Sequence, residues 1–233
     1  MSPTRTNSPS VSSLLAPKVV DTLDRLHQRA RTDLFRIALV APFVVPDFFG
    51  LRKVDDDRLS RHMRSVYVPV SRSQGQMLYL IARSIDARRI VEFGTSFGIS
   101  TLYLASAVKD NGGGVVVGSE FEPSKHAKAL EHLREAELDA FIDVRLGDAL
   151  KTLVDVEAPV DMVLLDGWKD TYLPVLKVLQ PKLRPRAVVL ADNIFTFKRA
   201  LRPYVDYVQS GTNGFVSSTL DIADGFELSI FTG

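Results

Sequence analysis

Arg89-Ile-Val-Glu-Phe-Gly-Thr-Ser-Phe-Gly-Ile-Ser-Thr101 is the stretch from which the fold of this chain is best predicted. Residues 90–93 form a short, mostly apolar run, which is typical of a buried strand in a parallel sheet. Gly94 and Gly98 allow a sharp turn, and from Ile99 the apolar residues recur with helical spacing. A strand, a glycine turn and a helix N-terminus in succession present free backbone N–H groups to a ligand. This stretch therefore predicts the ligand-binding unit of an α/β fold.

The spacing of the glycines indicates which ligand the turn accepts. A dinucleotide fingerprint has the pattern G-x-G-x-x-G, but Ser96 stands where the second glycine belongs. The chain instead has Glu92 shortly before Gly94, and Gly98 one turn after it. This pattern resembles the cofactor motif of class I S-adenosylmethionine methyltransferases, in which the glycine turn passes under the methionine part and the acid organises its ammonium side. A plain tight turn is the alternative, because glycine turns after strands are common in α/β proteins.

The composition fits one globular domain. The 233 residues are 45% hydrophobic, enough for one full core, and a net charge of +1 implies no polyanion-binding surface. The absence of cysteine excludes thiolate nucleophiles, disulfides and cysteine zinc sites, which leaves oxygen or histidine ligands for a metal. No apolar run approaches the roughly 20 residues of a membrane span. We therefore expect a cytoplasmic protein that binds neither nucleic acid nor membrane, and a homodimer is left open.

The N-terminal third divides into three predicted parts. Residues 1–16 are rich in Ser, Thr and Pro, and predict a disordered tail in preference to a transit-type segment. Residues 17–67 are expected to be a helical lid or substrate region, with a helix from Pro17 to about Leu39 and a short one over residues 55–67. Residues 68–233 are expected to form the cofactor-binding core, so that 17–233 is a single domain.

Strands and helices are predicted to alternate along this core. Ser71 or Ser73 is a candidate N-cap for a helix that ends near Ser84. Regular alternation indicates a parallel, doubly wound sheet. Two strand-like runs joined through Asp224-Gly225 indicate a C-terminal hairpin. After the strand in residues 89–93, the expected strands are 115–119, 142–146, 160–165, 187–191, 214–220 and 225–231, and the expected helices are 123–137, 149–154 and 172–183.

Acidic residues follow the second and third predicted strands, at the sheet edge where α/β proteins bind ligands. Glu120 lies where an acid would accept both hydroxyls of a ribose, whereas Glu122 is expected to cap the helix that starts at Pro123. Asp148 is expected to accept from an adenine amino group, although it would equally serve as the cap of the following helix.

The fourth and fifth predicted strands also end in carboxylates, Asp166 and Asp192. Adjacent strands would place them close together, and a shared cation would relieve their repulsion. With Asn193 they form an all-oxygen set suited to Mg²⁺; a helix cap and a turn are the structural alternatives. Lys169 follows Asp166 in the same loop, and a neighbouring cation would favour its neutral amine as a base, while a surface lysine is the alternative.

Two other residue types bear on the site. Trp168, the only tryptophan, is expected to form a wall of the site instead of filling the core. All four histidines are expected on the surface, because their surroundings are helical or charged and no ligand spacing links them; they are His27, His62, His126 and His132.

The stretches Asp161-Met-Val-Leu-Leu-Asp-Gly-Trp-Lys-Asp-Thr-Tyr-Leu-Pro174 and Val189-Leu-Ala-Asp-Asn193 resemble the cation-dependent O-methyltransferases, catechol O-methyltransferase in particular. The similarity covers roughly residue 68 to the C-terminus. It implies a Rossmann-like class I methyltransferase fold, with a mostly parallel seven-stranded sheet, an antiparallel strand from the C-terminal hairpin and extra N-terminal helices. It also implies S-adenosylmethionine and Mg²⁺ or Mn²⁺ as cofactors, and a small hydroxylated acceptor, such as a vicinal dihydroxy aromatic.

The resemblance assigns roles to individual residues. Lys169 becomes the base that deprotonates the acceptor, and the metal ligands become Asp166, Asp192 and Asn193. The cofactor-binding residues it implies, together with those expected from their position, are Val70, Glu92, Gly94, Ser100, Glu120, Phe121, Asp148, Asp166 and Trp168.

The chain departs from the family pattern at two site positions. Gly167 stands where the catechol enzymes have a histidine that contacts the adenine. Ser218 falls where they have the glutamate that binds the second catechol hydroxyl, which puts catechol itself in doubt. Alternatives are methyl transfer to a carboxylate or a nitrogen without metal, a non-catalytic module that binds S-adenosylmethionine, and a nicotinamide dehydrogenase.

Overall fold

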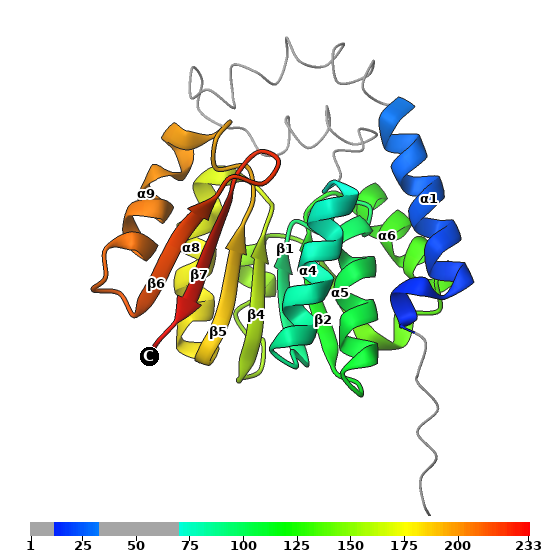
Figure 1. Cartoon of the computed structure of the whole chain (residues 1–233), viewed down its shortest axis with the longest axis horizontal. Coiled ribbons are helices and arrows are strands. Elements are labelled where there is room, and N and C mark those ends of the chain that lie inside the picture. Colours follow the sequence, from blue (N-terminus) through cyan, green and yellow to red (C-terminus); the bar gives the residue numbers. More distant parts are fainter. Residues whose placement is uncertain (1–11, 33–69) are drawn as a thin grey trace, which may run out of the picture.

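The computed structural model describes residues 12–32 and 70–233 of the chain. In these ranges a seven-stranded sheet of order β3-β2-β1-β4-β5-β7-β6 is flanked by helices (Figure 1). The strands are β1 (Arg89–Phe93), β2 (Val115–Glu120), β3 (Ile142–Leu146), β4 (Val160–Leu165), β5 (Leu183–Ala191), β6 (Phe215–Leu220) and β7 (Phe226–Phe231). The α-helices are α1 (Pro17–Thr32), α4 (Arg72–Ser84), α5 (Ile99–Asp110), α6 (Pro123–Glu135), α7 (Ala149–Thr152), α8 (Tyr172–Leu179) and α9 (Lys198–Gln209). Short 3₁₀ helices are η1 (Ser13–Leu15), η2 (Asp139–Phe141), η3 (Lys169–Thr171) and η4 (Gln180–Lys182).

The strands from β3 to β5 are all parallel, and of the seven described strands only β7 runs in the opposite direction. β1 pairs in parallel with β2 and β4, and β4 pairs in parallel with β5. β7 is antiparallel to both β5 and β6. The predicted architecture, a mostly parallel seven-stranded sheet with an antiparallel strand from the C-terminal hairpin, is therefore confirmed.

Alternate residues of the central strands enter two separate hydrophobic cores, because successive side chains in a strand point to opposite faces. Ile90 and Leu164 pack with α1, α4, α5 and α6 on one face. Val91 and Val163 pack with α7, α8 and α9 on the other. Burial on both faces explains why these strands read as continuous aliphatic runs instead of alternating patterns.

Residues 12–16, which the sequence analysis assigned to a disordered tail, belong to the fold. Asp110 at the end of α5 accepts a hydrogen bond from Ser13 N at 3.0 Å and one from Ser12 Oγ at 3.1 Å. The acid that orders this segment lies about a hundred residues away, so local composition carried no sign of it. The rest of the predicted tail, the end of the helix expected to reach Leu39 and the helix over residues 55–67 lie outside the described residues.

The start of α4 confirms one of the predicted caps. Ser71 Oγ accepts from Gln74 N at 3.2 Å, and Gln74 Oε1 accepts from Ser71 N at 2.7 Å, which completes a capping box. Helix α9 was not predicted, since Pro203 and several charged residues interrupt its sequence. In the part of the chain with described coordinates, no helix has the length and apolar character that crossing a membrane would require.

Candidate active site

The ends of β1, β4 and β5 bring two predicted site residues, Asp166 and Asp192, to the same edge of the sheet. The strands are in register with Phe93 beside Leu165, and Leu165 beside Ala191. Asp166 N donates to Phe93 O at 2.8 Å, and Asp192 N donates to Leu165 O at 3.1 Å. Asp166 and Asp192 therefore follow neighbouring strands at the same sheet edge, as the sequence pattern predicted.

A cavity of about 460 Å³ opens at this edge. Its wall contains most of the predicted site residues, namely Gly94, Glu120, Phe121, Asp148, Asp166, Trp168, Lys169 and Asn193. Four others are buried beside the cavity without lining it, namely Val70, Glu92, Ser100 and Asp192. The structure thus places Trp168 at a wall of the site, as expected. It also brings most of the predicted site residues to the wall of one cavity.

Gly94 allows β1 to pass close to the loop after β4. Its φ is +97°, and a Cβ built on it would lie 2.6 Å from the backbone oxygen of Asp166. Both the left-handed conformation and the close backbone approach require glycine here.

We expect Gly94→Ala to lower the free energy of unfolding by about 2–5 kcal/mol, since a positive φ costs about 1–2 kcal/mol and overpacking adds about 1–3 kcal/mol. The matched control is Gly113→Ala, because Gly113 has φ +104° but nothing within 4 Å of its added Cβ. The loss of unfolding free energy in Gly113→Ala should therefore reflect the backbone strain of a positive φ, without the cost of overpacking. Urea unfolding of both variants gives the comparison, and equal losses would contradict the close approach at Gly94.

Glu92 is a fully buried carboxylate behind the glycine turn. Its Oε2 accepts from Thr101 Oγ1 at 2.6 Å and from Thr95 Oγ1 at 3.0 Å, while Oε1 has no partner among the described residues. Burial raises the pKa of Glu92 to about 6, although the neighbouring hydroxyls favour the charged form. An unpartnered buried acceptor beside the cavity suits the ammonium group of a methionine moiety.

The raised pKa predicts a pH dependence of stability. The native carboxyl binds its proton more tightly than the unfolded one, so the free energy of unfolding should fall as pH rises from about 4.5 to about 6. The decrease should be about 2 kcal/mol. Because other acids titrate nearby, the measured quantity is the difference between the wild type and Glu92→Gln at each pH. A difference that stays constant across this range would show that Glu92 is not perturbed.

Glu120 is held at the end of β2 by backbone donors. Its Oε2 accepts from Ser96 N at 2.7 Å, and its Oε1 accepts from Glu122 N at 2.8 Å. Each oxygen keeps a further lone pair for a ligand hydroxyl. Glu122 itself accepts from Ser124 N at 3.4 Å and caps α6, which confirms its predicted role.

Asp148 is observed in one of the two roles that the sequence left open. Its Oδ1 accepts from Leu150 N at 2.9 Å and caps α7. The residue also lines the cavity together with Phe121. The cap is observed directly, and the adenine contact stays a prediction.

Lys169 joins the carboxylates at the opposite end of the cavity. Its Nζ donates to Asn193 Oδ1 at 2.7 Å and to Tyr172 OH at 2.6 Å, and it lies 3.4 Å from Asp166 Oδ1. The ammonium also lies 4.9 Å from the centre of the Tyr172 ring and 5.6 Å from that of Phe197. The lysine that the sequence singled out is therefore fixed among the predicted metal ligands.

The carboxyl groups of Asp166 and Asp192 both have raised pKa values. Burial, together with the nearby charge of Asp166, raises the pKa of Asp192 to about 7. Burial also raises the pKa of Asp166, against the attraction of Lys169. These two acids and the Asn193 side-chain oxygen form an oxygen set that fits a hard divalent cation. In the structure the Lys169 ammonium contacts two of these three side chains, Asp166 and Asn193, and supplies the positive charge there. The described residues contain no cluster of three or more His, Cys, Asp or Glu side chains suited to a metal, so this set relies on one amide oxygen.

Sequence reasoning missed two residues that contact this cluster. Tyr172 is fully buried, and its hydroxyl accepts from Lys169 and donates to Asp192 O at 3.3 Å. Gln74 donates from Nε2 to both Asp192 oxygens, at 3.2 and 3.3 Å. The spacing Ser71-x-x-Gln74 was a visible capping-box signal, whereas nothing local linked Gln74 to Asp192, which directly follows β5.

The two positions that depart from the family pattern have structural explanations. A Cβ on Gly167 would lie 2.4 Å from Cζ of Phe93, so the Phe93 ring fills the space that a side chain at 167 would enter. Ser218 is exposed on β6, opposite Leu228, and does not line the cavity.

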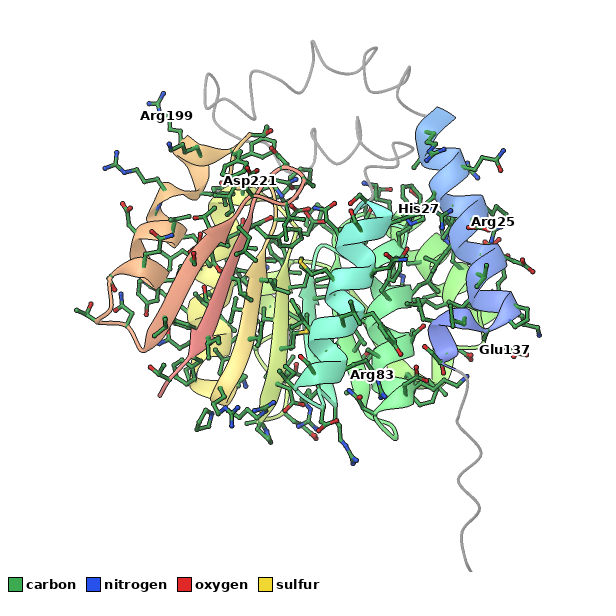
Figure 2. The ribbon with its side chains drawn as sticks, in the orientation of Figure 1. Arg25, His27, Arg83, Glu137, Arg199 and Asp221 are labelled. Carbon is green, nitrogen blue, oxygen red and sulfur yellow. The ribbon has the colours of Figure 1, made fainter. Side chains whose placement is uncertain are left out.

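The expectation that the histidines are surface residues was wrong for two of them. His27, labelled in Figure 2, is 7% exposed and lies 3.2 Å from Tyr103 OH. His132 is 2% exposed, and its Nδ1 lies 2.9 Å from Phe97 O. Burial lowers the pKa of both imidazoles, which favours their neutral forms. His126 is partly buried, and His62 lies outside the described residues.

Comparison with known proteins agrees with this geometry. Residues 91–194 match the family described as a methyltransferase domain. Catechol O-methyltransferase of Niastella koreensis is 33% identical over 131 residues, which cover 54% of this chain and 58% of that protein. Catechol O-methyltransferase of Mycobacterium tuberculosis is 36% identical over 129 residues, which cover 54% of this chain and 57% of that protein. The matched part is thus less than two thirds of the length of either relative.

A solved structure extends the similarity over most of the described fold. The O-methyltransferase TomG from Streptomyces achromogenes, solved in complex with SAM, superposes with a TM-score of 0.68 at 28% identity. The match covers 81% of this chain and 96% of that one. The resemblance inferred from the sequence is confirmed, since residues 91–194 match a methyltransferase domain and the fold is similar to that of an O-methyltransferase solved with SAM.

Proposed function

We propose that this chain, whose residues 91–194 match a methyltransferase domain, transfers a methyl group from S-adenosylmethionine to a hydroxyl of a small acceptor. The observation that carries the proposal is the composition of one cavity wall, where the Gly94 turn and Glu120 meet the cluster of Lys169, Asp166 and Asn193. S-adenosylmethionine would supply an electrophilic methyl group there. The similarity of the chain to catechol O-methyltransferases and to the SAM-bound TomG supports the same reaction.

The cofactor would be held along the strand ends. Glu120 would accept from the ribose hydroxyls, with Phe121, Asp148 and Trp168 around the adenine. Glu92, Ser100 and the backbone of Val70 would bind the methionine end, since all three are buried and the first two flank the Gly94 turn in the sequence.

Asp166, Asp192 and Asn193 would hold Mg²⁺ or Mn²⁺, which lowers the pKa of a bound acceptor hydroxyl. Lys169 would then take the hydroxyl proton at Nζ, and the cavity would hold the two reactants in contact. A vicinal dihydroxy aromatic is the acceptor class we propose. Because Ser218 is exposed and away from the cavity, the second hydroxyl would bind without the glutamate of the catechol enzymes.

The decisive experiment is a mass-spectrometric methyl-transfer screen over phenolic acceptors, run with and without EDTA. Metal-dependent methylation of a hydroxyl is the expected result. Methylation of a carboxylate or a nitrogen that EDTA does not affect would favour the metal-independent alternative. Binding of S-adenosylmethionine with no turnover on any acceptor would favour a non-catalytic module.

Glu120 gives a prediction for the cofactor alone. We expect Glu120→Ala to weaken binding of S-adenosylmethionine by on the order of 2–3 kcal/mol, the usual value for hydrogen bonds to a charged group. Isothermal titration calorimetry measures it directly. Glu122→Ala is the matched control, because it removes a neighbouring carboxylate that caps α6 and does not line the cavity. Equal affinities in both variants would reduce Glu120 to a structural residue.

A further inference from the structure

Gln74 is a buried amide that touches two parts of the proposed site. It lies in the first turn of α4 and is 4% exposed. Its Oε1 accepts from Ser71 N at 2.7 Å, next to Val70 at the proposed methionine end of the cofactor. Its Nε2 donates to Asp192 Oδ1 at 3.2 Å and to Asp192 Oδ2 at 3.3 Å. Within residues 12–32 and 70–233, this amide therefore hydrogen-bonds Ser71 and Asp192.

The orientation of the amide follows from its two neighbours. Ser71 N–H can only donate, so the amide oxygen must face it. The NH₂ group must then face Asp192, whose carboxylate can accept from it. The flipped amide would set NH₂ against N–H and oxygen against carboxylate, which is unfavourable on both sides. The capping box of α4 thus fixes which way the donor points.

We propose that Gln74 is the positioning residue of Asp192, holding its carboxylate in the orientation that a divalent cation needs. This inference rests on the proposed function, which makes Asp192 a metal ligand. Metal-ligating carboxylates are themselves hydrogen-bonded by neighbouring groups, and loss of such a partner typically costs 10–100-fold in metal affinity. Asn193 N also donates to Asp192 Oδ1 at 2.7 Å, but only Gln74 bonds Oδ2 among the side chains of the described residues.

The choice of glutamine over glutamate supports this role. A capping box is formed equally well by Glu or Gln at this position, because either oxygen accepts from the N-cap N–H. Only glutamine also offers a donor to a carboxylate. A glutamate would place a third negative charge about 3 Å from Asp192, at the distance Nε2 now occupies.

The test compares Gln74→Leu with Ser71→Ala by measuring Mn²⁺ affinity, through electron paramagnetic resonance, and thermal unfolding. Neither measurement requires S-adenosylmethionine, acceptor or turnover. Ser71→Ala removes the hydroxyl half of the cap, so we expect Tm to fall by about 2–4 °C with Mn²⁺ affinity within twofold of wild type. Gln74→Leu should lower Tm similarly and weaken Mn²⁺ binding about 10–100-fold. Wild-type Mn²⁺ affinity in Gln74→Leu would overturn the inference.

Gln74→Glu keeps the test valid if the leucine variant does not fold. It preserves the cap but replaces the donor by a charge, so its metal-free Tm should lie below that of wild type, and Mn²⁺ should raise Tm by more than in wild type. Wild-type values for both quantities would reduce Gln74 to a helix cap. If the wild-type protein binds no Mn²⁺, the metal assignment is wrong, and the inference about Gln74 is wrong with it. If wild type and Gln74→Leu bind Mn²⁺ equally, only the inference about Gln74 is wrong.

Discussion

Lys169→Ala should lower kcat by about 10²–10⁴-fold, the usual contribution of a positioned proton acceptor. The reason is geometric as well as chemical, because Nζ is fixed among Asp166, Asn193 and Tyr172 at the end of the cavity. Affinity for S-adenosylmethionine should change little. Affinity for a divalent cation should not fall, since the ammonium competes with a cation for the same oxygens. Single-turnover kinetics with saturating cofactor and cation separate these effects.

Two further variants make the Lys169 result specific. Lys169→Arg should give no rescue, because a guanidinium stays protonated at any working pH. Lys177→Ala is the matched control, since Lys177 also lies over a tyrosine ring but on α8 beside Tyr207, away from the cavity. Near wild-type kcat in the arginine variant would show that Lys169 acts through its charge and not as a base.

Removal of divalent cations should abolish turnover, with a loss of roughly 10³-fold or more, because a bound cation supplies several kcal/mol of charge stabilisation. EDTA followed by dialysis tests this, and Mg²⁺ or Mn²⁺ should restore the rate. Asp192→Ala should reproduce the loss and should not respond to added Mg²⁺.

The metal prediction has a direct control. Asp170→Ala removes an exposed acid from the same loop, so its response to EDTA and Mg²⁺ should match that of wild type. Full turnover of the EDTA-treated wild type would show that the acids are structural and that Lys169 alone neutralises them.

Most of the sheet was predictable because its strands are buried on both faces and end at turn residues. β3 and β4 occupy the residues expected for them, and the hairpin lies where Asp224-Gly225 placed it. Helix α9 was missed, although Leu201, Tyr204 and Val208 have helical spacing and are buried. Pro203 and the charges around it hide that pattern, and packing against the sheet decides the outcome.

The site likewise contains residues that could be predicted from the sequence and residues that could not. Residues that follow strands, such as Asp166 and Asp192, could be placed because parallel strands end at one edge. Gln74 could not be linked to Asp192, since the two are 118 residues apart and meet only through packing. His27 and His132 were misjudged for the same reason, as their partners Tyr103 and Phe97 lie in distant segments. The spacing of apolar residues indicates which face of a helix or strand is buried, but it does not indicate which polar residue of another segment will contact that face.

Phe93 under Gly167 constrains the order in which substitutions could accumulate in this lineage. A histidine at position 167 would clash with the ring while Phe93 is present, so that exchange is accessible only after position 93 has become smaller. The reverse change, a phenylalanine at 93, is accessible only after 167 has lost its side chain. The two sites are therefore coupled, and a side chain at 167 cannot be introduced without a change in the Phe93 ring.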